Sequence, residues 1–313
     1  MEDRILKTVR AAVLGHAVAD ALGVPVEFSS RAERDADPVR EMRGYGSYPV
    51  PAGAWSDDTS MALCALDSLA EGTWDLEDVL RRFALWYTED EYTPTGEMFD
   101  VGGTCSAAIE QYLAGTPAVL CGQKGERSVG NGALMRLYPF VLWAWIRGGT
   151  FEEWEEKLEL ATALTHAHPR AILASGIYAR VLFALLRNPS KEAAFSALRE
   201  ARCAYADHGE IGHFARLLSP RLLALRREEI TSSGYAVATL EASLWCLFTT
   251  ESYREAVERA VNLGDDTDTV AAVTGALAGV LYGEEAIPEE WRSSLLGLDL
   301  IQKITERFLS AHE

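Results

Sequence analysis

The sequence lacks any close pairing of cysteines. Its 313 residues include five cysteines, none of which belongs to a C-x-x-C pair: Cys64, Cys105, Cys121, Cys203 and Cys246. Neither a disulfide framework nor a zinc site built on cysteine is therefore indicated. We expect the five thiols to be reduced and to serve in packing.

Basic residues are also scarce. The chain has 29 Lys and Arg residues against 47 Asp and Glu residues, which gives a formal net charge of -18 at pH 7. No basic stretch offsets this charge, which argues against nucleic acid or an anionic membrane as the principal partner. An anionic substrate would bind only where a metal ion or helix N-termini reverse the local sign of the charge.

Long uncharged apolar runs are missing as well. No such run reaches the roughly 18 strongly apolar residues that a membrane span requires. The N-terminal stretch has no apolar core of the kind found in signal peptides. We therefore predict a cytoplasmic protein that has no membrane partner, and we make no prediction of its oligomeric state.

The alternation of apolar and polar residues that marks strands is not sustained in any segment. Helical periodicity recurs instead, with breaks at prolines and glycines. Helices are expected at about residues 4–22, 56–72, 75–88, 104–114, 133–147, 151–165, 169–187, 190–206, 210–218, 234–249, 252–263, 267–283 and 288–308, with a long ordered loop from Val24 to Trp55. No linker and no repeat divides the chain, so residues 1–313 are predicted to form a single all-α domain.

Two clusters of acids open apolar helices. One cluster is Ser56-Asp57-Asp58-Thr59, and the other runs from Asp265 to Thr269. The second cluster is followed by a segment, Val270 to Gly283, without any charge. An uncharged helix is buried on all sides, so the acids at its start face the interior or a cleft.

Helix capping explains part of this pattern, because Ser and Asp are preferred at N-caps and acids favour the first turn. One cap does not need three acids, however. Buried carboxylates that crowd together raise one another's pKa values and are stabilised by a cation. Oxygen ligands of this kind suit Mg²⁺, Mn²⁺ or Ca²⁺, whereas zinc is disfavoured without a cluster of Cys or His.

Other acid-rich helical proteins do not fit the clusters. Isoprenoid-diphosphate synthases carry D-D-x-x-D, but Met61 and Thr269 stand where the last acid of that motif would be. Helical phosphohydrolases of the His-Asp kind need an adjacent His-Asp pair, which does not occur. An EF-hand loop needs Gly at its sixth position and Glu at its twelfth, and neither cluster supplies both.

Taken together, the sequence resembles the ADP-ribosylglycohydrolases, a family that includes the dinitrogenase-reductase-activating glycohydrolase and the hydrolases of ADP-ribosylarginine and ADP-ribosylserine. The resemblance depends on five motifs in the family's order. They are Gly15-His16-Ala17-Val18-Ala19-Asp20-Ala21-Leu22-Gly23 with Glu27 after it, Trp55-Ser56-Asp57-Asp58-Thr59, Gly130-Asn131-Gly132-Ala133-Leu134-Met135-Arg136, Leu164-Thr165-His166, and Gly264 to Gly283.

The resemblance implies a compact orthogonal multi-helix bundle that holds a binuclear Mg²⁺ or Mn²⁺ centre. The metal ligands that it implies are Ser56, Asp57, Asp58, Asp266, Asp268 and Thr269. Asp265 has no matching ligand role. The catalytic carboxylates implied are Glu27, Asp57 and Asp58, and the roles of general acid and general base are not divided among them.

The resemblance also implies residues that bind the substrate. Gly130-Asn131-Gly132 is expected at the start of a helix, where backbone N–H groups and the helix dipole suit a diphosphate. The other substrate-binding residues implied are Ser128, Met135, Gly102, Gly103, Thr104 and His166. Relatives often stack adenine on an aromatic residue just before Gly-Asn-Gly. Val129 stands there in this chain, which leaves Tyr92, Phe99 or Tyr138 as candidates.

The function expected from the resemblance is the removal of ADP-ribose from a modified protein side chain, with arginine as the first choice. Two metal ions would hold the ribose hydroxyls and activate a water molecule for attack. One alternative is hydrolysis of a small ADP-ribose derivative, such as O-acetyl-ADP-ribose or another N- or O-riboside. The other is an immunity or binding protein that occludes an ADP-ribosyltransferase. Metal-competent residues at every implied ligand position count against decay of the site.

Overall fold

The structure, a computed structural model, describes residues 2–311, and within this range the regular structure is helical without any strand. The α-helices are α1 (Glu2–Gly23), α2 (Arg31–Ala36), α3 (Asp57–Leu69), α4 (Leu76–Glu89), α5 (Gly103–Leu113), α6 (Tyr138–Arg147), α7 (Phe151–Ala163), α8 (Pro169–Arg187), α9 (Lys191–Ala204), α10 (Ala236–Phe248), α11 (Tyr253–Val261), α12 (Thr267–Tyr282), α13 (Glu289–Arg292) and α14 (Leu298–Ser310). Short 3₁₀ segments and isolated bridges complete the fold. The prediction of an all-α architecture is therefore confirmed.

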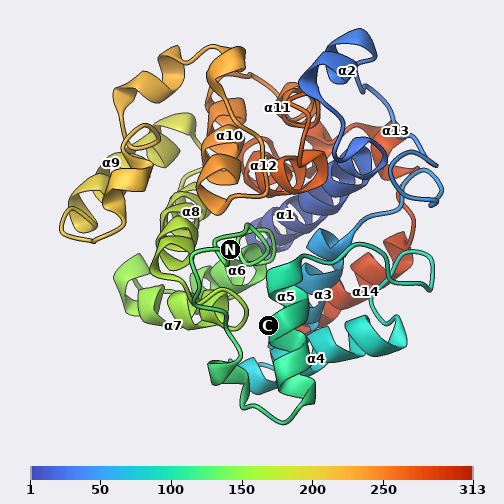
Figure 1. The fold of residues 1–313 in the computed structure, drawn as a ribbon, viewed down its shortest axis with the longest axis vertical. Helices are drawn as coiled ribbons and strands as arrows, with labels where there is room; N and C mark the ends of the chain where they lie inside the picture. Colours follow the sequence, from blue (N-terminus) through green and yellow to red (C-terminus); the bar gives the residue numbers. More distant parts are fainter. Residues whose placement is uncertain (1, 312–313) are drawn as a thin grey trace.

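Helices α1 and α12 lie side by side in the middle of the molecule (Figure 1). Glycines allow their backbones to approach closely. A Cβ atom added to Gly275 would lie 2.2 Å from the carbonyl oxygen of Gly15, and one added to Gly279 would lie 2.1 Å from that of Ala11. Glycine at positions 275 and 279 is therefore required by the contact between the two helices.

The other helices surround this central pair. Helices α3 and α14 pack on α1, whereas α8, α10 and α11 pack on α12. In Figure 1, α7, α8 and α9 lie on one side of the pair, and α3, α4, α5 and α14 lie on the other. Because α1 and α12 are covered on most sides, the N-terminal ends of α3 and α12 meet inside the protein.

Two helical segments have the length and composition of membrane spans. They are Asp3–Val26 and Pro169–Arg187, and 94% and 78% of their most apolar windows are buried within the fold. Core helices of soluble proteins pass the same test, so these segments are weak evidence for a membrane span. The cysteines agree with the sequence prediction, since all are free and only Cys203 is exposed among them.

Three of the predicted helices were wrong in extent. Residues 133–136 form turns, and α6 begins only at Tyr138. Most of the region 210–218 is a 3₁₀ segment, Ile211–Phe214, with turns. The expected helix at 288–308 is divided into α13 and α14, because Gly297 adopts a φ of 60° before α14.

The predicted loop between Val24 and Trp55 is mainly irregular but contains α2. Ser30 caps this short helix, since its hydroxyl oxygen accepts a hydrogen bond from the backbone N–H of Glu33. The Glu33 carboxylate in turn accepts a hydrogen bond from the backbone N–H of Ser30 at 2.7 Å. This reciprocal capping pattern, Ser followed three residues later by Glu, is readable from sequence.

Candidate active site

The N-terminus of α3 carries the first acidic cluster. Ser56 is the N-cap residue, and its hydroxyl lies 2.9 Å from Asp20 Oδ1 and 3.1 Å from Asp58 Oδ2. Asp20, which lies on α1, also accepts hydrogen bonds from the backbone N–H of Thr59 at 3.1 Å and from its hydroxyl at 2.6 Å. Asp20 thus satisfies the first N–H groups of α3 from a neighbouring helix and fixes the position of the cluster.

The second cluster lies at the N-terminus of α12. Asp266 is the N-cap residue but makes no side-chain capping bond, which leaves its carboxylate directed to other groups. The hydroxyl of Thr269 lies 3.2 Å from Asp58 Oδ2 and so links α12 to α3. Asp265 is exposed, with a φ of 65°, and its backbone N–H donates to the carbonyl of Ser29. Its side chain is therefore separate from the acidic cluster, in line with the absence of a predicted ligand role.

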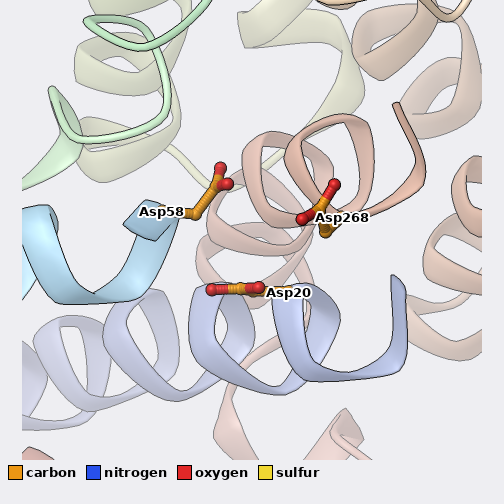
Figure 2. A group of neighbouring side chains, drawn as sticks. All are labelled: Asp20, Asp58 and Asp268. Carbon is orange, nitrogen blue, oxygen red and sulfur yellow. The ribbon is translucent and has the colours of Figure 1, made fainter. Parts of the chain in front are cut away.

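The acids converge from different helices on one buried space. Asp20, Asp58 and Asp268 project from α1, α3 and α12 toward one another (Figure 2), and each offers an oxygen within 4.8 Å of the others. A second group with the same spacing consists of Glu27, Asp100 and Asp268. Asp268 belongs to both groups, so the two potential cation positions adjoin.

Burial raises the pKa of every carboxyl group in these two groups. The pKa of Glu27 rises to about 9, first because burial penalises its charged form and then because acids surround it. The pKa of Asp20 rises to about 6 because of burial. The pKa values of Asp58 and Asp268 are raised well above the usual range, by burial first and by neighbouring carboxylates second. A cation among them would favour the ionised forms.

Several oxygens in the cluster are suited to bind a cation. Among the residues that the structure describes, Asp58 Oδ1, Asp266 Oδ1 and Asp268 Oδ2 are buried and have no hydrogen-bond partner. Unpaired buried carboxylate oxygens are costly, and hard divalent cations are their usual partners in proteins. The predicted ligands therefore fit one or two Mg²⁺ or Mn²⁺ ions.

Glu27 is held at the edge of the cluster by Tyr48. The Tyr48 hydroxyl donates a hydrogen bond to Glu27 Oε2 at 2.6 Å, and the Tyr48 ring packs on Phe99 with 5.1 Å between ring centroids. Phe99 precedes Asp100, so one aromatic contact fixes the loops that carry both acids. Tyr48 lies in the long loop before α3, where the sequence has no periodic signal.

A cavity of about 310 Å³ opens beside the acids. It brings together most of the predicted site residues: Glu27, Asp57, Gly102, Gly103, Thr104, Gly130, Asn131, Gly132, Met135, His166, Asp266 and Thr269. Ser56, Asp58 and Asp268 are buried next to it rather than lining it. Ser128 is half-buried and is not among the described residues that line the cavity, so its role in binding remains a prediction.

The expected helix start at Gly130-Asn131-Gly132 was wrong, because turns follow this segment. Its backbone pairs instead with the segment before α10, where the Asn131 N–H donates to the carbonyl of Gly234 at 3.0 Å. The Asn131 side chain donates to Asp266 Oδ2 at 2.8 Å and thereby ties this turn to α12. A helix N-terminus does face the cavity, but it belongs to α5 at Gly102 and Gly103.

None of the three aromatic candidates for adenine stacking lines the cavity. Tyr138 is fully buried, and its ring centroid lies 4.8 Å from that of His16. The Tyr92 hydroxyl is bound to Asp67 at 2.8 Å. Phe99 is occupied by its contact with Tyr48. The exposed aromatic at the cavity is instead Phe28, which follows Glu27 and has 70% of its surface accessible.

Sequence reasoning missed the site positions of Asp100 and Tyr48, and it quoted Asp20 without a role. Asp20 lies within a motif of the resemblance, and its place four residues after His16 on an otherwise apolar helix was a usable signal. Asp100 directly precedes the Gly102-Gly103 loop, which was also a usable signal.

The whole chain, residues 1–313, matches the family model of the ADP-ribosylglycohydrolases. The ADP-ribosylarginine hydrolase Tri1 of Serratia proteamaculans is 32% identical over 310 residues, which cover 98% of this chain and 80% of that protein. The ADP-ribosyl-(dinitrogen reductase) glycohydrolase of Rhodospirillum rubrum is 33% identical over 289 residues, which cover 91% and 88%. A solved structure of an ADP-ribosylglycohydrolase-related protein complex has a TM-score of 0.82 and 32% identity, with 99% of this chain and 100% of that chain covered.

Proposed function

The chain belongs to the ADP-ribosylglycohydrolase family, and from this premise we propose that it removes ADP-ribose from modified arginine side chains of proteins with the aid of two divalent cations. The family makes it a hydrolase of N- or O-glycosidic bonds. The choice of arginine is supported by the relative from Serratia proteamaculans, whose name specifies ADP-ribosylarginine. The choice of metal chemistry is supported by the unpaired carboxylate oxygens at the start of α3 and α12.

We infer that the cations are Mg²⁺ or Mn²⁺ and that six residues hold them: Ser56, Asp57, Asp58, Asp266, Asp268 and Thr269. When bound, such ions polarise coordinated oxygens and lower the pKa of a bound water. Asp20 would hold the start of α3 in place without being a ligand, because both of its oxygens already accept hydrogen bonds from Ser56 and Thr59.

The side chains around the cavity would supply charge stabilisation and proton transfer. Cleavage of the bond at C1 of the ribose develops positive charge on the sugar, and the carboxylates of Glu27, Asp57 and Asp100 line the cavity where that charge would form. Glu27 lines the cavity and is oriented by the Tyr48 hydroxyl at 2.6 Å, whereas Asp58, which the Ser56 and Thr269 hydroxyls contact, lies outside the cavity lining. A carboxyl group held in this way is suited to exchange a proton with the attacking water or the leaving group.

The diphosphate of the substrate would lie at the N-terminus of α5. A Cβ atom added to Gly102 or Gly103 would meet no atom within 4 Å. The Gly102 N–H donates to Asp57 Oδ2 at 3.3 Å, so an anion would reach the N–H groups that follow it in the first turn of α5. Free N–H groups and the helix dipole together favour a phosphate at such a position. Gly102, Gly103 and Thr104, which the resemblance implies as substrate-binding residues, lie at this position.

The test is the release of ADP-ribose from an arginine-ADP-ribosylated protein. Wild-type protein with Mg²⁺ or Mn²⁺ should release it, and a chelator should abolish the release. The variant with both Asp57→Ala and Asp268→Ala should be inactive, whereas Asp265→Ala, which alters an exposed acid outside the cluster, should retain activity. Full turnover by the double variant would refute the proposal.

Two other functions remain as outcomes of this test. If ADP-ribose is released from O-acetyl-ADP-ribose but not from the modified protein, the chain is a hydrolase of small ADP-ribose derivatives. Tight binding to an ADP-ribosyltransferase that persists in the chelator would indicate an immunity or binding protein. Product analysis and a binding measurement therefore separate the three possibilities.

A further inference from the structure

Arg136 is fully buried, yet it has no carboxylate partner among residues 2–311. Its Nη1 donates to the carbonyl of Ala161 at 3.2 Å, and its guanidinium carbon lies 5.0 Å from the centroid of the Phe83 ring. Burial lowers the pKa of Arg136 to about 10, so the group still carries its charge at neutral pH. Buried charges are normally paired, because an unpaired one is destabilising. Among residues 2–311 the charge meets neutral oxygen acceptors and the face of an aromatic ring, so a bound anion would add the balancing charge.

A short chain of hydrogen bonds leads from this guanidinium toward the cavity. Arg136 Nη2 donates to Thr165 Oγ1 at 2.7 Å, and Thr165 Oγ1 lies 2.8 Å from His166 Nδ1. Arginine has only donors, so the Thr165 oxygen must be the acceptor in the first bond. Its own hydroxyl proton is then free to be donated to His166 Nδ1.

The direction of the bond between Thr165 and His166 is linked to the ring nitrogen of His166 that carries the proton. A neutral imidazole has one donor nitrogen and one acceptor nitrogen. A Thr165 hydroxyl that donates its proton to Nδ1 places the ring proton of a neutral His166 on Nε2. Burial, followed by the charge of Arg136, lowers the pKa of His166 to about 3, which keeps the ring neutral. His166 is thus a hydrogen-bond donor through Nε2.

The Nε2 edge of His166 lies against two glycines that line the cavity. A Cβ atom at Gly130 would lie 3.3 Å from Nε2, and one at Gly132 would lie 3.1 Å from Cε1 and 2.7 Å from Cys105 Sγ. Glycine at these two positions leaves the imidazole edge uncovered. The spacing of Gly-Asn-Gly therefore has a second reason besides the turn, namely access to this donor.

The cavity has little positive charge of its own. None of the described residues that line it is Lys or Arg, and its acids include Glu27, Asp57, Asp100 and Asp266. A diphosphate ligand would be repelled unless cations and oriented N–H groups offset these acids. Arg136, placed behind His166, is a charge of the required sign.

We propose that Arg136 and Thr165 are positioning residues that fix His166 as a neutral Nε2–H donor, and that Arg136 supplies positive charge opposite the diphosphate of an ADP-ribose ligand. The second part rests on the proposed function. The plain structural account, in which Arg136 only ties the end of α7 to the following turn, does not predict a preference for one tautomer or for an anionic ligand.

The first experiment reads the tautomer in the wild-type protein without any ligand. In nitrogen-15 NMR of histidine-labelled protein, the His166 signal is identified by its absence in His166→Gln. This signal should show the Nε2–H tautomer and should not titrate between pH 5 and 8. In Thr165→Val the signal should move toward a mixture of tautomers, whereas Thr165→Ser should restore the wild-type signal. A wild-type ring protonated on Nδ1 would overturn the relay.

The second experiment measures ADP-ribose binding by calorimetry in the presence of Mg²⁺. Thr165→Val should raise the Kd for ADP-ribose about tenfold or more, because this is the usual cost of losing a hydrogen bond in a charged network. Thr165→Ser should bind like the wild type. Thr162→Val is the matched control, because the Thr162 hydroxyl is equally buried and bonds only the carbonyl of Leu158. The affinity of Thr165→Val for adenosine, which lacks the diphosphate, should be less than twofold below that of the wild type.

The outcomes separate the relay from the proposed function. Unchanged ADP-ribose affinity in Thr165→Val, or equal losses for ADP-ribose and adenosine, would overturn the role of Arg136, acting through Thr165 and His166, in binding the diphosphate, even if the wild type is an active hydrolase. A wild type that binds no ADP-ribose would overturn that role together with the proposed function. The tautomer of His166 would still be decided by NMR in either case.

Discussion

At the scale of single residues, Asp265 and Asp268 show how burial decides the role of an acid. Asp268 is buried among acids that raise its pKa, and one of its oxygens has no partner within the described residues. Asp265 is exposed, and only its backbone is engaged. The same side chain is therefore suited to bind a cation at one position and is a surface group at the other.

Asp268→Asn should abolish cation binding and lower turnover by more than about 10²-fold, since loss of an outer partner of a metal site alone costs about 10–100-fold. The variant should also be more stable than the wild type in a chelator at pH 8, because a buried charge has been removed. Calorimetry with Mn²⁺ and thermal unfolding measure the two effects. Asp265→Asn is the control and should match the wild type in both; a similar loss there would contradict the assignment.

Tyr48→Phe should lower kcat by about tenfold while ring packing on Phe99 persists. The hydroxyl of Tyr48 donates to Glu27 and so opposes the rise in the pKa of that carboxyl. Its removal should raise the pKa of Glu27 further. The limb of the profile of kcat/KM against pH that reports Glu27 should then move to higher pH, and an unshifted profile would exclude this role.

The sequence predicted the acids at helix starts because capping positions and apolar periodicity are local signals. Asp57, Asp58, Asp266 and Asp268 all follow such signals. Tyr48 and Asp100 lie in irregular loops, where position depends on tertiary contacts such as the packing of Tyr48 on Phe99. The partnerless charge of Arg136 was also hidden, because a sequence does not show which residues are absent around a side chain.

At the scale of elements, the packing of α1 on α12 sets the spacing of the acids. Gly15 and Gly275 face each other, and a Cβ atom at Gly275 would lie 2.5 Å from Ala19 Cβ and closer still to the Gly15 carbonyl. Asp20 follows Ala19 on α1, and Asp268 lies two turns before Gly275 on α12. Any separation of these helices would move the two carboxylates apart.

Gly275→Ala should therefore cost about 1–3 kcal/mol or more in the free energy of unfolding, as expected for overpacking against backbone atoms. It should also weaken cation binding, because Asp20 holds the acids at the start of α3, which would then move away from Asp268. Denaturant unfolding and Mn²⁺ titration test both effects. Gly209→Ala is the control: a Cβ atom there meets nothing within 4 Å, and the change should stay within about 0.5 kcal/mol. A neutral Gly275→Ala variant would show that the helices have room to adjust.

Helix interiors were predictable, whereas helix ends near the site were less so. The segment after Gly132 has helical composition, but Asn131 is drawn to Asp266 and its backbone pairs with Gly234, so regular structure resumes only at Tyr138. Gly297 has a left-handed conformation that divides α13 from α14. Both departures come from tertiary contacts or backbone geometry that helical periodicity does not encode.

At the scale of the whole molecule, the net charge of -18 coexists with a buried acidic cluster at the centre. Surface acids are solvated, and some are paired with arginine, as Asp78 is with Arg82 at 2.7 Å. Acids at the meeting point of α1, α3 and α12 lack such partners. The fold therefore holds like charges together at its core, and a cation is the partner that the arrangement favours.

The stability of the cation-free protein should fall as the pH rises above about 4. Glu27 and Asp20 have folded-state pKa values of about 9 and about 6, above their ordinary values of 4.5 and 3.8. In this window the folded state binds more protons than the unfolded state, so stability is full below the unfolded pKa and is lost as the pH rises through the folded pKa. The contribution of Asp78 to stability has the opposite dependence on pH, because its pKa is lowered to about 2. This contribution changes only below about pH 4.

Divalent cations should reverse this trend. They bind the ionised carboxylates of the folded state, so saturation at about 100 times Kd adds about 2.7 kcal/mol, and the gain is larger at higher pH, where fewer protons must be displaced. Thermal unfolding from pH 5 to 9 should show that the difference between Tm in Mn²⁺ and Tm in chelator grows with pH. A single transition is expected if the chain is a single domain. Asp268→Asn should make the difference in Tm smaller. If Tm in the chelator instead rose with pH, the carboxylates would already be paired within the protein, and the centre would need no metal.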